Sequence, residues 1–442
     1  MKPSNAYMKP KINICWLRRD LRLEDNAALY HALKSEYPVL LLFIFDKNIL
    51  SKLADPQDAR VTFLHQTLTA LNDQLQKNQG SAILIKYGNP EEIWQELSQT
   101  YQLHTVYSNH DYEPDAINRD RAIQEQLQAA NIQFQSYKDQ VIFEKSEITK
   151  ADGLPYTVFT PYFRQWQQKL NAFYSSAYPT EKYFQNFWPT PAFPIPTLKE
   201  IGFDISSQQF PGKDFEHKLD GYEQSRDIPA ADATSHIGMH LRFGTISIRK
   251  AVQAALTQKA EKWLSELAWR DFYQMILFHF PHTVTKSFKP KYDLIKWRNH
   301  PDEFEAWCKG NTGYPLVDAG MRQLNETGYM HNRVRMVVAS FLCKHLLIDW
   351  RWGEAYFAEK LLDYEMASNV GGWQWACGSG NDAAPYFRVF NPELQMKKFD
   401  PQLKYVDHWV PAYKQLKHVL PMVEHAFARE RVLKVFKAAL NE

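Results

Sequence analysis

The sequence has few cysteines and no long apolar run, and both shortages argue against whole classes of protein. Its 442 residues include only Cys15, Cys308, Cys343 and Cys377, which are far apart and form no CxxC pair. This argues against a disulfide scaffold and is typical of a reducing cytosol. No run reaches the ~18 apolar residues of a membrane span, and the polar segment 1–11 lacks the apolar stretch of a secretory signal. We therefore expect a cytoplasmic protein, nucleoid-associated if bacterial, with no membrane contact.

The motifs of the commonest enzyme chemistries are missing as well. There is no GxxxxGK followed by Ser or Thr, and the turn Arg18–Arg22 after the first predicted strand contains no glycine. A phosphate-binding loop and a dinucleotide fingerprint are thereby excluded. The pair His279 and His282 has no further ligands nearby in the sequence and is more typical of a loop, so we expect no metal site. Gly378-Ser-Gly380 does not match the nucleophile elbow GxSxG.

The sequence is rich in aromatic residues, which make up 14% of it, and nine of its 13 Trp follow residue 200. The formal net charge is only +2, but the range 242–298 holds eleven Lys or Arg against four Asp or Glu. A basic stretch interleaved with Trp and Tyr is typical of a surface that binds phosphates and stacks bases. A solvated helical face would have the same composition, so this feature alone leaves both interpretations open.

The apolar pattern divides the chain into three parts. Short apolar runs at 12–17, 39–45, 82–85, 103–107 and 132–137 alternate with the helical patterns 27–33, 61–75, 91–97 and 115–130. This alternation predicts a doubly wound five-stranded parallel sheet over 11–137. The range 138–212 contains eight prolines and predicts a connector across the surface without a long helix. The range 213–442 predicts an all-α domain, with three-to-four spacing at 248–260, 263–278, 302–309, 314–326, 333–347, 352–361 and 425–440.

Four long motifs in the second half of the chain and one at its start carry a family resemblance. The four are Thr312–Leu324, Gly328–Met336 (Gly-Tyr-Met-His-Asn-Arg-Val-Arg-Met), Asp363–Trp375 and Ala383–Pro392, and the fifth is Trp16–Asn26. In order and spacing the chain resembles the photolyase/cryptochrome family, most of all its class I cyclobutane pyrimidine dimer photolyases. The resemblance covers nearly the whole chain. It implies an α/β domain, a connector and a helical domain that binds FAD.

The resemblance also implies which residues bind FAD. Tyr222, Thr234, Ser235, His236, Ile237 and Gly238 match the segment around the FAD phosphates, where Gly238 replaces a serine that is usual in the family. Arg270 matches an arginine that pairs with the phosphates, and Trp263 lies on the same predicted helix. Asn369 matches the residue that faces the flavin N5, and Asp363 matches a carboxylate that faces the ring edge and pairs with Arg335. Tyr364 and Glu365 complete this set, with Glu365 standing where Asp is frequent.

The substrate residues follow in the same way. Trp269 and Trp375 match the two indoles that form the walls of a slot for a flipped-out dimer, and Met336 matches the methionine beside it. Glu266 matches a hydrogen-bonding partner of the thymine edge, and Asn332 and Arg333 match the pair at the mouth of the slot. Related (6-4) photolyases have histidines around positions 332–336, so Asn-Arg-Val-Arg-Met favours the cyclobutane dimer. The remaining expected DNA contacts are Arg226, Gln395 and Lys397.

Three tryptophans match the chain that passes electrons to the flavin: Trp297 at the surface, Trp350, and Trp373 beside the flavin. Glu113 matches an acidic residue that holds a folate antenna chromophore, methenyltetrahydrofolate. Other members of the family use a deazaflavin or a flavin as antenna, or have none, and the sequence leaves these alternatives open. An exposed carboxylate at the start of a helix explains Glu113 equally well.

The resemblance therefore implies a lyase that repairs cyclobutane pyrimidine dimers in single- or double-stranded DNA, as a monomer, by electron transfer from excited reduced FAD. The alternative is a cryptochrome, a blue-light sensor without repair activity. The residues expected in the dimer slot favour the lyase.

Overall fold

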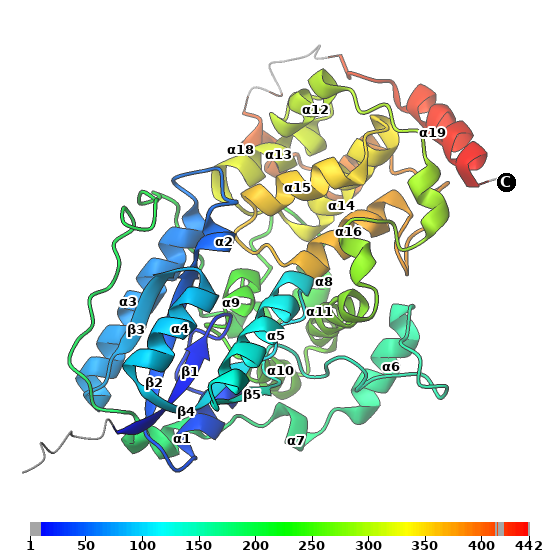
Figure 1. Ribbon diagram of the computed structural model, residues 1–442. Helices are drawn as coiled ribbons and strands as arrows, with labels where there is room; N and C mark the ends of the chain where they lie inside the picture. Colours follow the sequence, from blue (N-terminus) through cyan, green and yellow to red (C-terminus); the bar gives the residue numbers. More distant parts are fainter. Residues whose placement is uncertain (1–9, 412, 414–419, 441–442) are drawn as a thin grey trace, which may run out of the picture. The chain divides into compact units, whose positions relative to one another are not determined.

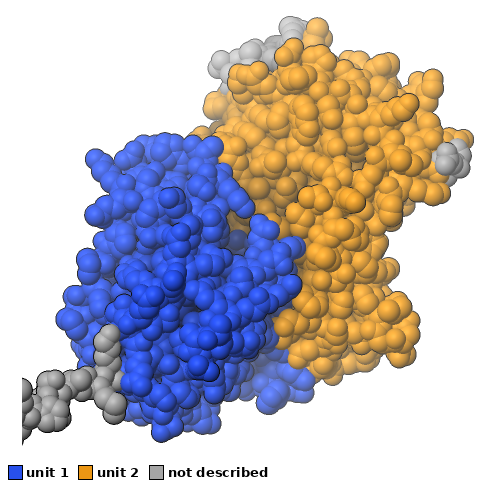
Figure 2. Space-filling model, in the orientation of Figure 1, with its two compact units in different colours: residues 1–142, 171–210, 240–253 blue, residues 143–170, 211–239, 254–442 orange. Residues whose placement is uncertain are grey.

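The computed structural model describes residues 10–411, 413 and 420–440, which form two compact units (Figure 2). Unit 1 contains residues 1–142, 171–210 and 240–253, and unit 2 contains residues 143–170, 211–239 and 254–442. Of the polar N-terminal segment, residues 1–9 lie outside the described range. In the part of the chain that the structure describes, no helix is long and apolar enough to cross a membrane.

Unit 1 is built on a five-stranded, all-parallel sheet with the strand order β3-β2-β1-β4-β5 (Figure 1). The strands are β1 (Lys11–Leu17), β2 (Val39–Asp46), β3 (Ile83–Gly88), β4 (Gln102–Asn109) and β5 (Gln133–Tyr137). All eight residues of β2 are buried, as an inner strand covered on both faces requires. The predicted doubly wound sheet is confirmed.

Helices cover both faces of this sheet. They are α1 (Ala27–Leu33), α2 (Lys47–Leu50), α3 (Ala59–Gln79), α4 (Pro90–Thr100) and α5 (Pro114–Ala129). On one face, Trp16 packs with Trp94 and Leu97 of α4 and with Ile123 and Leu127 of α5. The four predicted helices begin and end within four residues of α1, α3, α4 and α5, and α2 was not predicted.

The prediction that the segment 138–212 contains no long helix is wrong. The segment contains the eleven-residue helix α6 (Phe159–Lys169), followed by α7 (Ala172–Ser175) and the 3₁₀ helix η1 (Thr180–Asn186). Tyr162 and Trp166 of α6 are buried. Prolines flank this helix or lie in its first turn, where a missing N–H costs nothing, so their number did not exclude a helix. The predicted division of the chain into the parts 11–137, 138–212 and 213–442 stays a prediction.

Unit 2 is helical, as predicted, although the sequence pattern missed several of its helices. The α-helices are α8 (Tyr222–Ser225), α9 (Gly238–Arg242, shared with unit 1), α10 (Ile248–Thr257, also shared), α11 (Glu261–His279), α12 (Pro301–Cys308), α13 (Pro315–Thr327), α14 (Asn332–Ser340), α15 (Trp350–Lys360), α16 (Met366–Cys377), α17 (Pro392–Phe399), α18 (Lys404–Trp409) and α19 (His425–Leu440). The predicted helical patterns do not include α8, α9, α16, α17 and α18. The predicted helix 333–347 is α14 followed by a π-helical turn at Phe341–His345.

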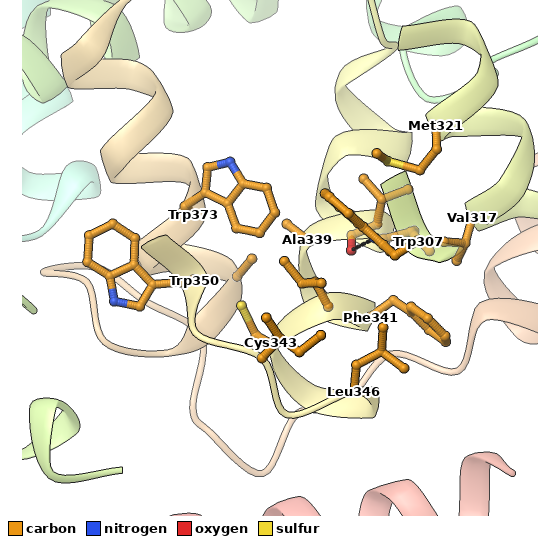
Figure 3. Packing of buried hydrophobic residues seen from close by; sticks show 14 of the residues in the cluster. Trp307, Val317, Met321, Ala339, Phe341, Cys343, Leu346, Trp350 and Trp373 are labelled. Atoms are coloured by element: carbon orange, nitrogen blue, oxygen red, sulfur yellow. Dashed lines mark hydrogen bonds between the residues drawn. The ribbon is translucent and has the colours of Figure 1, made fainter. Parts of the chain in front are cut away.

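A large apolar core lies among α13, α14, α15 and α16 (Figure 3). Glycine allows these helices to approach closely. A Cβ at Gly353 of α15 would lie 2.1 Å from the ring of Trp373 on α16, and a Cβ at Gly320 of α13 would lie 2.4 Å from Val334 on α14. Trp350 and Trp373 are 1% and 2% exposed in this core.

Candidate functional site

Helix α11 carries four of the predicted site residues. Glu266, Trp269 and Arg270 are spaced i, i+3 and i+4, which places them on one face of the helix. Trp263 is buried one turn earlier, where its ring lies parallel to Phe215 at 5.5 Å. Helix α16 packs against both α11 and α14, so the predicted residues of these three helices belong to one region of unit 2.

Four charged side chains, which we call the rim cluster, connect α11 and α14: Arg226, Asp227, Glu266 and Arg333. Arg226 forms an ion pair with Glu266, and its Nε lies 3.8 Å from Asp227. Asp227 accepts hydrogen bonds from Arg333 Nη2 at 2.8 Å and Nε at 3.2 Å. The predicted phosphate-binding arginines are therefore held by carboxylates, one of which, Asp227, was not predicted.

Arg333 has two further contacts. Its guanidinium lies 4.4 Å from the ring centroid of Phe399, and its Nη1 lies 3.6 Å from the sulfur of Met336. Asn332, next to it, is exposed at the start of α14, and His331 caps this helix by accepting from the backbone N–H of Arg333. The predicted substrate residues of α14 therefore lie together at its first turn.

The indole of Trp269 has an unpredicted neighbour. Phe159, from the start of α6, lies parallel to it, with 3.7 Å between ring centroids and 11° between planes. Trp375 of α16 is half-buried beside Phe390, at 6.4 Å. Gln395 and Lys397 lie on α17, where Lys397 is exposed.

Two ion pairs unite residues that were predicted to bind FAD. Arg270 pairs with Glu365 at 2.7 Å, and both side chains are at most 10% exposed. Arg335 pairs with Asp363 at 2.9 Å, which agrees with the predicted pairing. A Cβ at position 238 would lie 3.0 Å from Asp363 Oδ2, so Gly238 gives this carboxylate room.

The segment 234–238 is tied to the helices around it. Thr234 shares a hydrogen bond with the hydroxyl of Tyr329 at 3.0 Å, and the indole N–H of Trp263 donates to Ser235 at 3.4 Å. His236 has a φ of 55° and lies 3.0 Å from Asp232. Ile237 is buried, whereas Tyr222 and Tyr364 are half-buried. Burial and the nearby Glu266 raise the pKa of Tyr222, which therefore stays a neutral hydrogen-bonding group.

Asn369 of α16 is oriented by Glu354. Its amide nitrogen donates to Glu354 Oε1 at 2.9 Å and to the Glu354 backbone carbonyl at 3.1 Å. Burial raises the pKa of Glu354. With both amide hydrogens directed at Glu354, the amide oxygen is the atom of Asn369 that can accept a hydrogen bond from a bound group.

The three predicted relay tryptophans differ in exposure. Trp297 is half-buried and packs edge-on against Phe436 of α19, at 5.9 Å. Trp350 and Trp373 belong to the apolar core, where Trp373 also contacts Trp307 edge-on at 6.0 Å (Figure 3).

Glu113 belongs to unit 1, apart from the other predicted residues. Its carboxylate pairs with Arg19 at 3.1 Å and with Arg242 at 2.7 Å. Its role toward an antenna chromophore stays a prediction. Among the described residues, no group of three or more His, Cys, Asp or Glu side chains is placed to hold a metal ion.

The residues that sequence reasoning missed here are Phe159, Asp227, Tyr329 and Glu354. Two of them had a signal in the sequence: Tyr329 lies inside the motif Gly328–Met336, and Asp227 directly follows Arg226. Phe159 and Glu354 belong to none of the motifs.

Comparisons with known proteins point to one family. A family model described as the FAD binding domain of DNA photolyase matches residues 263–427, and one described as DNA photolyase matches residues 13–182. The deoxyribodipyrimidine photo-lyase of Agrobacterium fabrum is 36% identical over 96% of this chain and 97% of its own length.

Two solved structures share the fold. A bacterial class III photolyase from Agrobacterium tumefaciens superposes with a TM-score of 0.85 and 35% identity, covering all of both chains. A cryptochrome from Synechocystis superposes with a TM-score of 0.84 and 27% identity, covering 97% of this chain and 99% of its own.

Proposed function

Because this chain belongs to the DNA photolyase family, we propose that it is a light-dependent lyase that splits cyclobutane pyrimidine dimers in DNA. The observation that carries the proposal is the combination on α11, α14 and α16 of aromatic walls, a methionine and paired arginines. Trp269 and Met336 lie on helices that the rim cluster connects. A flipped-out lesion needs stacking surfaces for its bases and cations for its backbone.

The donor set of unit 2 suits FAD. Arg270 and Arg335 are both held beside a carboxylate, which keeps charged groups in place where burial would otherwise penalise them. The amide oxygen of Asn369 is suited to accept from the N–H of a reduced flavin ring. Bound FAD would supply the light-excited electron donor, so the reaction would need no general acid or nucleophile.

The protein's own residues would then hold the dimer. The open face of Trp269 and the indole of Trp375 would stack on the two bases, and Met336 would fill the apolar side. Glu266, held by Arg226, would accept a hydrogen bond from a base edge. Arg226, Arg333 and Lys397 would bind phosphates without reading the sequence.

The cofactor would be returned to its reduced state by electrons that pass through the predicted relay of Trp297, Trp350 and Trp373. Their exposure falls from the half-buried Trp297 to 2% or less for the other two, which is the order that a relay from solvent to the interior requires. The absence of a side chain at Gly353 supports this role, because it allows α15 to lie directly against Trp373.

The proposal is tested with the full chain carrying chemically reduced FAD and a duplex with one thymine dimer. Blue or near-ultraviolet light should convert the dimer to two thymines, which chromatography of the digested DNA detects, and dark samples should not change. Trp297→Phe should abolish photoreduction of oxidised FAD yet leave repair by pre-reduced protein unchanged. Binding of the dimer without light-dependent conversion would contradict the proposal and favour a light sensor.

A further inference from the structure

Phe159 comes from the segment 138–212, yet its side chain lies against the predicted slot wall. Its ring covers one face of Trp269 with almost parallel planes. Phe272 and Tyr273 contact the same indole at 5.6 and 5.4 Å. Since Phe159 occupies one face of Trp269, only the opposite face can stack on a base.

The backbone at Phe159 and two residues before it is hydrogen-bonded to the turn that follows α16. The N–H of Phe159 donates to Asp382 Oδ2 at 3.0 Å, and the Asn381 side chain donates to the carbonyl of Thr157 at 3.1 Å. Trp375, the second predicted wall, lies near the C-terminal end of α16. The same short segment therefore contacts Trp269 on α11 and is anchored to the chain that continues from Trp375.

The stack continues away from the slot. Phe163, one turn later in α6, lies parallel to Phe159 at 5.5 Å and 10°. Phe159 is 8% exposed, so it is a packed residue with a defined orientation. Phe163 is a phenylalanine on the same helix as Phe159, and it contacts Phe159 on the side of the stack away from Trp269.

We propose that Phe159 is a positioning residue for dimer recognition. It sets the plane of the Trp269 indole, and through Asn381 and Asp382 it sets the distance of that plane from Trp375. Stacking depends on parallel planes and contact distance, so a wall that could rotate would lose part of its preference for the dimer. This inference rests on the proposed function.

The test compares Phe159→Leu with Phe163→Leu in the full FAD-bound chain. Each change removes one ring from the same stack and keeps an apolar side chain. We expect Phe159→Leu to weaken binding of a dimer-containing duplex by about two- to tenfold, the range of one aromatic pair, with undamaged duplex unaffected. Phe163→Leu should change neither affinity. Phe159→Tyr keeps the aromatic ring, so it should bind the dimer as the wild type does.

Equal losses from the two leucine variants, or equal losses on damaged and undamaged DNA, would overturn the inference, since they would indicate a general packing role. A Phe159→Leu variant that binds like the wild type would also overturn it. The proposed function is tested by the wild-type protein alone, which should prefer the dimer-containing duplex and repair it. The positioning role of Phe159 is tested by the variants, so a failure of one can be told from a failure of the other. Visible FAD absorbance of each variant confirms that unit 2 has folded.

Discussion

The two units each contain a cluster of arginine–carboxylate pairs, and the clusters differ in burial. In unit 1, Asp139 accepts from Arg22 and Arg249, both at 2.6 Å, and Asp25 also pairs with Arg249; their side chains are 1–11% exposed. In unit 2, the rim cluster has similar pairs with side chains 16–41% exposed. The same chemistry therefore serves two purposes.

Burial decides which purpose applies. A charge that is removed from water must keep its partner, because the unpaired ion is far less stable. The unit 1 cluster is therefore a fixed part of the fold. In the rim cluster, water or a phosphate can replace a carboxylate at modest cost, so these arginines remain available to DNA. Exposure, more than pairing, therefore separates the arginines that can exchange a carboxylate for a phosphate from those that are fixed in the fold.

The largest expected effect is on the buried cluster. Asp139→Asn removes the charged partner of the buried Arg22 and leaves Arg249 with Asp25 alone, and we expect it to lower the free energy of unfolding by about 3–5 kcal/mol. Urea denaturation followed by circular dichroism measures this loss. Glu96→Gln, which breaks the exposed pair with Lys86 in the same unit, should cost less than about 1 kcal/mol. Similar losses from both variants would show that burial does not separate the two kinds of pair.

The contribution of Asp139 to the free energy of unfolding should also depend on pH. Burial alone would raise the pKa of Asp139, but Arg22 and Arg249 lower it below its ordinary value. Because the pKa of Asp139 is lower in the folded than in the unfolded protein, the ionised carboxylate stabilises the folded state at pH values above about 3.9, the pKa of an unfolded Asp. This contribution is lost as the pH falls through the lower, folded value. The difference in unfolding free energy between wild type and Asp139→Asn should stay constant from pH 7 to 5 and shrink below about pH 4. A difference that grows on acidification would contradict this assignment.

Trp269→Ala tests whether stacking, and not the rim charges, discriminates damaged DNA. The change removes a stacking surface worth about 1–3 kcal/mol per base. Affinity for a dimer-containing duplex should fall accordingly, while affinity for its undamaged twin should hardly move. Titrations of both duplexes at several salt concentrations measure the two effects. Equal losses of affinity for the two duplexes would mean that Trp269 does not discriminate damaged from undamaged DNA, and they would favour the interpretation as a light sensor.

The smallest expected effect is at Asp227, where the rim cluster should tolerate loss of a carboxylate. Asp227→Asn should change unfolding free energy by less than about 1 kcal/mol. It should raise affinity for any duplex a few-fold and steepen the dependence of log affinity on log salt by up to about one unit, because Arg333 no longer exchanges a carboxylate for a phosphate. Glu305→Gln, an exposed ion-paired position on α12, makes the same charge change and should leave affinity unaltered. Weaker DNA binding by Asp227→Asn would mean that Asp227 orients the arginines more than it competes for them.

Much of the architecture was predictable because its causes are local. The run Val39–Phe45 is apolar throughout and becomes β2, and strand and helix patterns alternate over the first 137 residues. Helix α16 was missed because its polar and apolar residues do not separate onto two faces, so it has no amphipathic period. Helix α6 was missed because its neighbouring prolines indicated a loop.

The sequence by itself determined the parallel sheet, the helical second part, the family, and which side chains were candidates for the site. Only the tertiary structure decided how those side chains combine: Arg333 with Asp227, Arg270 with Glu365, and Phe159 against Trp269. Strand and helix periods depend on neighbours a few residues apart, so they can be read along the chain. Contacts between residues as distant as Phe159 and Trp269 depend on how α6 packs against α11, and local sequence does not contain that information.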